Sequence, residues 1–172
     1  MQTAITRPEA AEYAPYFERY VSLVPAGDLI STLTLQPAAT LLAELSEERG
    51  EYRYAEGKWS VKEALGHIID TERIMSYRAL RVGRADTTDL PGFHQDPYVE
   101  HAAFGARKLT DLLEEFRAVR ASTICLLRGM PADAWARAGR AGGNPITARA
   151  LAWIIAGHEL YHTDIYRQRY GL

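Results

Sequence analysis

Residues 147–169 read TARALAWIIAGHELYHTDIYRQR, and the spacing of their apolar side chains decides the fold class. A helix advances about 100° per residue. Counted from Ala148 on such a helix, four aliphatic side chains fall on one stripe centred at about 285°: Leu151, Ile154, Ile155 and Ile165. Thr147 is a suitable N-cap. The stretch therefore predicts an amphipathic helix over residues 147–169.

Three further segments carry the same helical period, at residues 28–48, 60–84 and 105–128. The second segment opens with Ser60 and Glu63, the Ser-x-x-Glu spacing of a capping box. Strand-like alternation is nearly absent, so the sequence predicts an all-α fold. Four helices of about 20 residues each favour a four-helix bundle.

The connections between these segments are unequal in length. Residues 85–104, ADTTDLPGFHQDPYVEHAAF, show no helical pattern. Long connections in compact domains are usually functional covers or crossovers. We expect a long crossover between the second and third helices, which would let residues 105–128 run parallel to residues 60–84. We expect a single domain over residues 1–172, with its core at about 28–169.

The composition is that of an ordinary globular protein. The 172 residues are 47% hydrophobic and 24% charged, and 20 Lys and Arg against 22 Asp and Glu give a formal charge of −2. This excludes a disordered or collagen-like chain. A near-balanced charge also argues against nucleic acid as a partner, because such domains usually carry a basic excess.

Targeting and redox signals are weak. Glutamates interrupt the N-terminal region, and no apolar run approaches the roughly 18 residues of a spanning helix. We therefore expect a cytoplasmic protein with no membrane contact. The one cysteine, Cys125, sits beside Ile124 and Leu126, and we expect a buried thiol.

Two histidines fall on the apolar stripe of residues 147–169. His158 lies at about 280° and His162 at about 320°, one turn apart, and an i, i+4 pair of imidazoles can reach one ion. The alternative is two core histidines that are hydrogen-bonded to neighbours. Two uncompensated polar groups side by side in an apolar core are costly, which favours a metal.

A third ligand is expected on another helix. His67 lies on the flank of the apolar stripe of residues 60–84, where it would face an adjacent helix. We expect His67, His158 and His162 to hold a divalent metal with water at an open fourth position, the arrangement of a catalytic site. His94 and His101 fall in the long connection, as surface or pocket-rim residues.

The string His158-Glu159-Leu160-Tyr161-His162 also matches the H-E-x-x-H signature of zinc peptidases. Those enzymes take a third ligand downstream, where this chain has Ile165 and Gln168 instead of the metzincin residues. A peptidase is therefore disfavoured. Glu159 is a candidate base at the edge of the stripe, with a solvated boundary carboxylate as the alternative.

Two charged residues also fall on apolar stripes, Glu72 on the helix of residues 60–84 and Arg120 on that of residues 105–128. Charged groups are seldom fully buried unless they are paired. We predict that Glu72 and Arg120 form a bidentate ion pair across the core.

Four motifs taken together resemble the DinB/YfiT-like metalloenzyme family: WSVKE at 59–63 with GH at 66–67, DTER at 70–73, LPGF at 90–93 and GHELYH at 157–162. The resemblance spans about residues 28–169. It implies a four-helix bundle with a long crossover, a divalent metal on His67, His158 and His162, often nickel or zinc, and frequent homodimers. His94 departs from the family's pattern, which has an acidic residue there, and is expected at the pocket rim or close to the metal as a further ligand.

Relatives in this family include transferases and isomerases that use bacillithiol, mycothiol or glutathione. The resemblance thus implies a transferase that uses a low-molecular-weight thiol and acts on a small-molecule substrate. One alternative is a metal-dependent hydrolase with a metal-activated water. The other is a non-catalytic bundle that binds a metal or a small ligand under residues 85–104.

Overall fold

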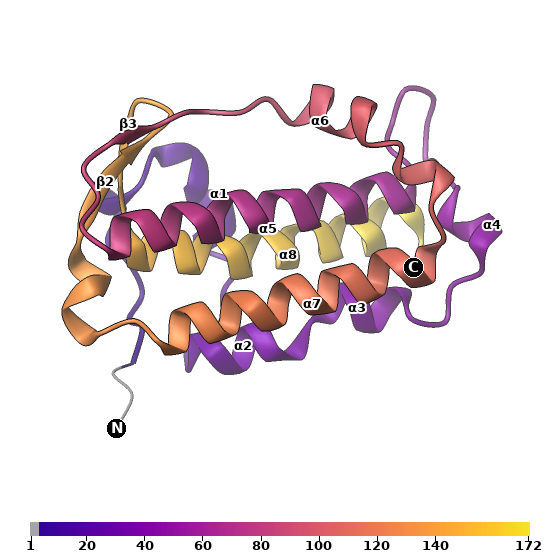
Figure 1. Cartoon of the computed structure of the whole chain (residues 1–172). Coiled ribbons are helices and arrows are strands. Elements are labelled where there is room, and N and C mark those ends of the chain that lie inside the picture. Colours follow the sequence, from indigo (N-terminus) through magenta and orange to yellow (C-terminus); the bar gives the residue numbers. More distant parts are fainter. Residues whose placement is uncertain (1–3) are drawn as a thin grey trace.

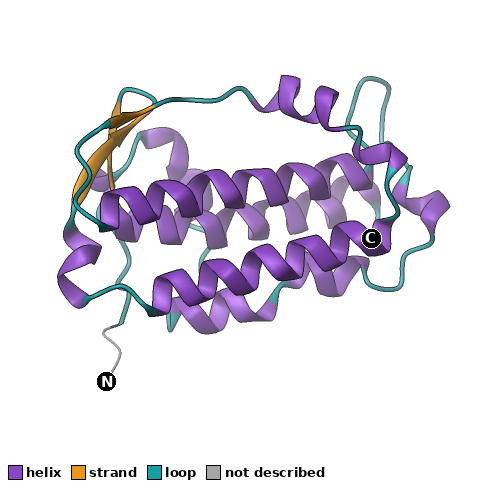
Figure 2. Cartoon of the chain, viewed as in Figure 1, coloured by secondary structure: helices purple, strands orange, loops and turns teal. Residues whose placement is uncertain are grey.

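The computed structural model describes residues 4–172, which are mostly helical (Figure 2). The α-helices are α1 (Glu18–Val21), α2 (Leu29–Leu35), α3 (Pro37–Leu42), α4 (Glu47–Gly50), α5 (Val61–Gly83), α6 (Gln95–Ala102), α7 (Leu109–Arg128) and α8 (Ala148–Tyr170). The strands are β1 (Asp89–Leu90), β2 (Ala138–Ala141) and β3 (Asn144–Thr147). Short 3-10 turns are η1 (Ala10–Glu12), η2 (Pro15–Phe17), η3 (Phe104–Ala106) and η4 (Ala132–Ala136). None of the helices in residues 4–172 combines the length and the hydropathy needed to cross a membrane.

The long helices α5, α7 and α8 form a four-helix bundle with the α2–α3 pair (Figure 1). Helices α5 and α7 run in the same direction. At their starting ends, Glu47 of α4 forms an ion pair of 2.8 Å with Lys62 and accepts a hydrogen bond of 2.9 Å from the Leu109 backbone. At their finishing ends, Gly83 lies against Met130. The predicted four-helix bundle with a parallel second and third helix is confirmed.

The connection between α5 and α7 therefore runs the length of the bundle (Figure 1). We call residues 84–108 the strap. One end is held by β1, which pairs in parallel with β2, and the other by Phe104, whose ring lies on Gly66 of α5. A Cβ at Gly66 would approach that ring to 2.4 Å, so the contact requires glycine.

The capping residues of two long helices behave as the sequence predicts. Ser60 and Glu63 form a complete capping box at the start of α5. Thr147 caps α8 by accepting a hydrogen bond from the Ala150 backbone. Predicted helix boundaries there hold to within a residue or two.

The prediction of one continuous helix over residues 28–48 is wrong. The chain breaks at Gln36, whose φ is +44°, and α3 begins at Pro37. Proline lacks an N–H and disfavours helical geometry at the residue before it, so the helix ends there. A second break separates α3 from α4.

Two other local expectations are also corrected: that residues 85–104 lack a helix, and that the chain lacks strands. Residues 85–104 contain β1 and α6. The sheet order is β1-β2-β3, with β2 and β3 antiparallel and joined through Gly142 and Gly143, whose φ values are +58° and +78°. These strands have two to four residues, too few for alternation to show.

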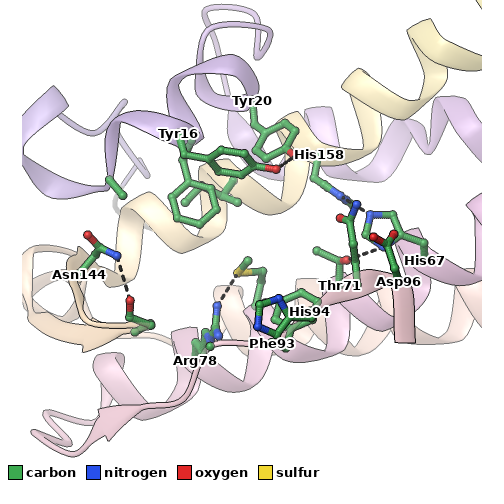
Figure 3. A pocket seen from close by; sticks show the side chains of 18 residues that line it. Tyr16, Tyr20, His67, Thr71, Arg78, Phe93, His94, Asp96, Asn144 and His158 are labelled. Carbon is green, nitrogen blue, oxygen red and sulfur yellow. Dashed lines mark hydrogen bonds between the residues drawn. The ribbon is translucent and has the colours of Figure 1, made fainter. Parts of the chain in front are cut away.

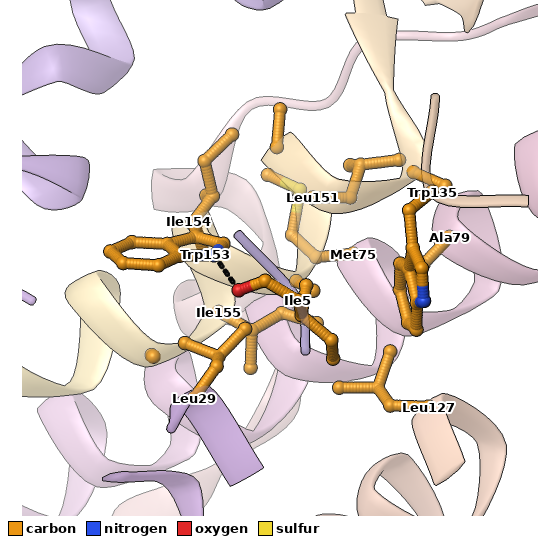
Figure 4. Close-up of a cluster of buried hydrophobic side chains, with 14 of the residues drawn as sticks. Ile5, Leu29, Met75, Ala79, Leu127, Trp135, Leu151, Trp153, Ile154 and Ile155 are labelled. Carbon is orange, nitrogen blue, oxygen red and sulfur yellow. Dashed lines mark hydrogen bonds between the residues drawn. The ribbon is translucent and has the colours of Figure 1, made fainter. Parts of the chain in front are cut away.

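A buried hydrophobic cluster of aliphatic and aromatic side chains fills the bundle beside the sheet (Figure 4). Met75 of α5 and Leu127 of α7 pack there with Leu151 and Ile154 of α8, as the predicted stripes require. Cys125 is exposed, contrary to prediction. Its neighbours along a helix point in other directions, so their apolar character does not bury it.

Candidate metal centre

Three histidines from two antiparallel helices meet inside the bundle. His67 comes from α5, and His158 and His162 come from successive turns of α8. The Nε2 atoms of His67 and His158 are 3.1 Å apart, and one ring nitrogen from each of the three lies within 4.8 Å of the others. All three side chains are buried, at 5–8% exposure. The structure thus brings together the three predicted ligands.

Burial keeps these imidazoles uncharged at neutral pH. It lowers the pKa of His67 to about 4 and that of His162 to about 3. The pKa of His158 falls well below its ordinary value because of burial and then because of the two neighbouring histidines. Neutral imidazole is the form that binds a metal ion.

The surroundings of the rings fit a divalent ion. Within residues 4–172, none of the three is hydrogen-bonded to a carboxylate, and His162 has no hydrogen-bond partner. Aromatic rings hold them in place instead: Trp59 lies 4.9 Å from His67 and Tyr20 lies 5.2 Å from His158, between ring centroids. Three converging nitrogen donors suit zinc, nickel, copper or iron rather than magnesium or calcium.

Two cavities border this cluster. The first, of about 430 Å³, touches His67 and His158 (Figure 3). The second, of about 540 Å³, touches His162. Tyr20 and Asp96 line both. A small molecule in either cavity would lie against the histidines, and both volumes suit small ligands.

The strap supplies a carboxylate that sequence reasoning missed. Asp96, in the first turn of α6, is near enough to His67 for its charge to raise the pKa of that ring against the larger effect of burial. His94 precedes α6 and lines the first cavity, whereas the exposed His101 bonds to the Pro97 backbone at 2.7 Å. The sequence signal for Asp96 was its position two residues after His94. Because α6 was not predicted, the direction of the Asp96 side chain could not be inferred from that spacing.

A buried charge network lies on the other side of α8. Arg120 donates from Nε and Nη2 to the two carboxylate oxygens of Glu72, each at 2.8 Å. Its Nη1 donates to Glu159 at 2.6 Å and to the Leu33 carbonyl at 2.8 Å. The predicted pairing of Glu72 with Arg120 is confirmed, and it extends to a third residue.

The structure does not bring Glu159 to the histidines' cavities. Its side chain is 2% exposed, it lines neither cavity, and its second oxygen accepts a hydrogen bond from the Ala38 backbone. Burial raises its pKa, although Arg120 opposes this. Glu159 is therefore not the solvated boundary carboxylate of the alternative prediction. It also does not border a cavity in which it could act as a base on a bound ligand. It joins α8 to the break between α2 and α3.

Comparison with known proteins agrees with this architecture. A family model described as the DinB superfamily matches residues 32–165. A solved structure, YfiT from Bacillus subtilis, is similar with a TM-score of 0.68 at 13% sequence identity, over 95% of this chain and 93% of that one. It is described as "a probable metal-dependent hydrolase with an unusual four-helix bundle topology". Among curated proteins, none matches the chain.

Proposed function

This chain belongs to the DinB superfamily, and we propose that it is a metal-dependent enzyme whose divalent ion is held by His67, His158 and His162. The observation that carries the proposal is the convergence of three buried, uncharged imidazoles at the end of two cavities. A divalent ion held there would lower the pKa of a coordinated thiol or water and so supply a nucleophile near neutral pH.

We propose transfer to or from a low-molecular-weight thiol as the reaction class. The two cavities support it, because a transfer reaction must hold two partners against one centre. Asp96 borders both cavities and can accept the thiol proton, while the rings of Trp59 and Tyr20 contact His67 and His158 and fix their orientation.

Hydrolysis is a second candidate, favoured by the likeness to YfiT. In that reaction Asp96 would take the proton of the attacking water, and one cavity would suffice. A bundle that binds a metal or small ligand without turnover is the remaining alternative. We further propose nickel or zinc as the metal, a homodimer, a cytoplasmic location and a single domain for the chain.

Metal content tests the proposal first. We expect the tag-free protein to purify with about one divalent ion per chain by elemental analysis. His158→Ala should lose it, because two imidazoles bind too weakly. The exposed His101 provides the matched control, and His101→Ala should retain the ion. A wild-type protein without metal under metal-replete growth would contradict the proposal.

Thiol titration then separates the reaction classes. In protein loaded with cobalt, added thiol should change the absorption spectrum if a thiol binds at the centre. Turnover of ester substrates without thiol, with no spectral change, would instead favour hydrolysis. A loaded centre that shows neither response would favour the non-catalytic alternative.

A further inference from the structure

Arg78 of α5 lies in the wall of the first cavity, away from the histidine cluster (Figure 3). Its side chain is buried, with 6% of the residue exposed. Helix α5 carries both Arg78 and His67 on the cavity side, separated by three turns. One element therefore fixes the distance between this cation and the histidines.

The charge of Arg78 has no counter-ion in the part of the chain that the structure describes. No carboxylate among residues 4–172 forms an ion pair with it. Its Nη2 donates to the Pro91 carbonyl at 2.6 Å, and its Nη1 makes a weak contact of 3.6 Å with the Met75 sulfur. The guanidinium also lies over the Phe93 ring, 5.6 Å from its centroid. None of these contacts supplies a negative charge, and charged residues are seldom buried without an opposite charge.

The guanidinium retains free donors. A guanidinium has five N–H groups in a planar fork, and two of those on Arg78 have the contacts just given. The Nε atom has no partner and is not fully buried, because the fully buried side-chain polar atoms without a partner in residues 4–172 are Gln36 Oε1 and Thr123 Oγ1. Because Arg78 lines the first cavity, a ligand there can approach this free donor.

The wall around Arg78 favours a head group with a single negative charge. Met75, Phe93 and Ile154 give this region an apolar surface, and the Asp96 carboxylate stands at the histidine end. A dianionic head group there would leave one charge uncompensated beside apolar groups. One guanidinium fork matches one carboxylate.

We propose that the first cavity takes a small organic acid, whose carboxylate binds the Arg78 guanidinium and whose other end lies at the histidine cluster. The position of the carboxylate follows from Arg78 and the cavity wall alone. Only the statement that the other end reacts rests on the proposed function.

Binding to the metal-free protein tests the carboxylate site without interference from an ion. The full chain is treated with chelator and titrated calorimetrically with hexanoate, hexanamide and hexyl phosphate. We expect hexanoate to bind more tightly than either analogue. Arg78→Met should weaken hexanoate about 10- to 100-fold, the effect of losing charge-assisted hydrogen bonds, and Arg78→Lys should fall between.

The matched control is Arg84→Met, which removes the same charge from an exposed residue at the end of the same helix. It should bind hexanoate as the wild type does. Equal hexanoate affinity in Arg78→Met and wild type would overturn the inference, as would equal binding of hexanamide or tighter binding of hexyl phosphate. The helical circular-dichroism spectrum and the melting temperature of Arg78→Met show that the variant is folded, whether or not the protein holds metal.

The same data separate this inference from the proposed function. Arg78-dependent binding of hexanoate by a protein that never acquires metal would refute the metal site and leave the acid site standing. Normal metal content together with hexanoate binding that is independent of Arg78 would refute the acid site and leave the metal site standing.

Discussion

Replacing Arg120 by methionine should destabilise the protein strongly, because the change leaves two carboxylates buried without a counter-charge. Arg120 is 0% exposed, and its side chain bonds to both oxygens of Glu72 and to one of Glu159. Methionine fills most of the same volume, so the effect reports the charge network rather than a cavity.

The expected magnitude follows from this burial. Removing one partner of a buried ion pair costs about 3–5 kcal/mol. In a chain of this size each kcal/mol lowers the melting temperature by about 2–4 °C, which gives a decrease of about 6–20 °C. By contrast, Arg73 pairs with Glu115 at the surface with 49% of its side chain exposed, and Arg73→Met should cost at most about 1 kcal/mol.

Urea denaturation of wild type, Arg120→Met and Arg73→Met measures these differences. The triple variant Glu72→Gln, Arg120→Met and Glu159→Gln should be more stable than Arg120→Met alone, because it removes the uncompensated charges. The Arg120→Met deficit should also grow from pH 5 to pH 8. Burial raises the pKa of Glu159, and in Arg120→Met no guanidinium opposes this. The folded variant then holds a proton on Glu159 that the unfolded chain releases, so its stability falls as pH rises. The reasoning would be refuted if Arg120→Met unfolded within about 1 kcal/mol of wild type, or if the triple variant were no more stable than Arg120→Met.

Three further predictions concern close contacts and titration. Gly66→Ala should lower the unfolding free energy by about 1–3 kcal/mol, since its Cβ would meet the Phe104 ring at 2.4 Å; calorimetric melting checks this. Gly157→Ala should be at least as harmful by the same assay, because its Cβ would lie 2.1 Å from the Tyr20 carbonyl oxygen. The metal-free protein should lose stability as pH falls from about 6.5 towards 4, by up to about 1.4 kcal/mol per pH unit for His67. The reason is that the His67 ring binds a proton in the unfolded chain over this range but stays neutral in the folded chain. Urea midpoints measured against pH check this, and midpoints that fall as steeply in His67→Gln as in wild type would contradict it.

Local signals in the sequence predicted the long helices because each carries its own start and period. Ser60 and Glu63 satisfy free backbone donors at the start of α5, and Thr147 does so for α8. Pro37 was a visible signal for the break after α2 that the aliphatic pattern outweighed. The strands form because the strap returns along the bundle and meets β2, a contact between distant residues that no short window contains.

In the candidate site, too, the residues placed by local periodicity were predictable and those placed by contacts with other elements were not. The placement of His158 and His162 is local to one helix and follows from periodicity. Glu159 and Arg78 depend on neighbours from other elements: one faces the break between α2 and α3, the other faces the strap. The angular position of a residue on an isolated helix gives the face of the helix on which its side chain lies, but it does not identify the residues that pack against that face.

The parallel course of α5 and α7 also has a kinetic consequence. In an up-and-down bundle each helix packs on its neighbour in sequence, so the chain can form successive hairpins. Here the pairing of His67 with His158 joins residues 91 apart, and that of Glu72 with Arg120 joins residues 48 apart. Folding slows as contacts become more distant in sequence. We expect this bundle to fold more slowly than up-and-down bundles of equal size. The reason is that the contacts of α5 with α7 and α8 form only after most of the chain has collapsed.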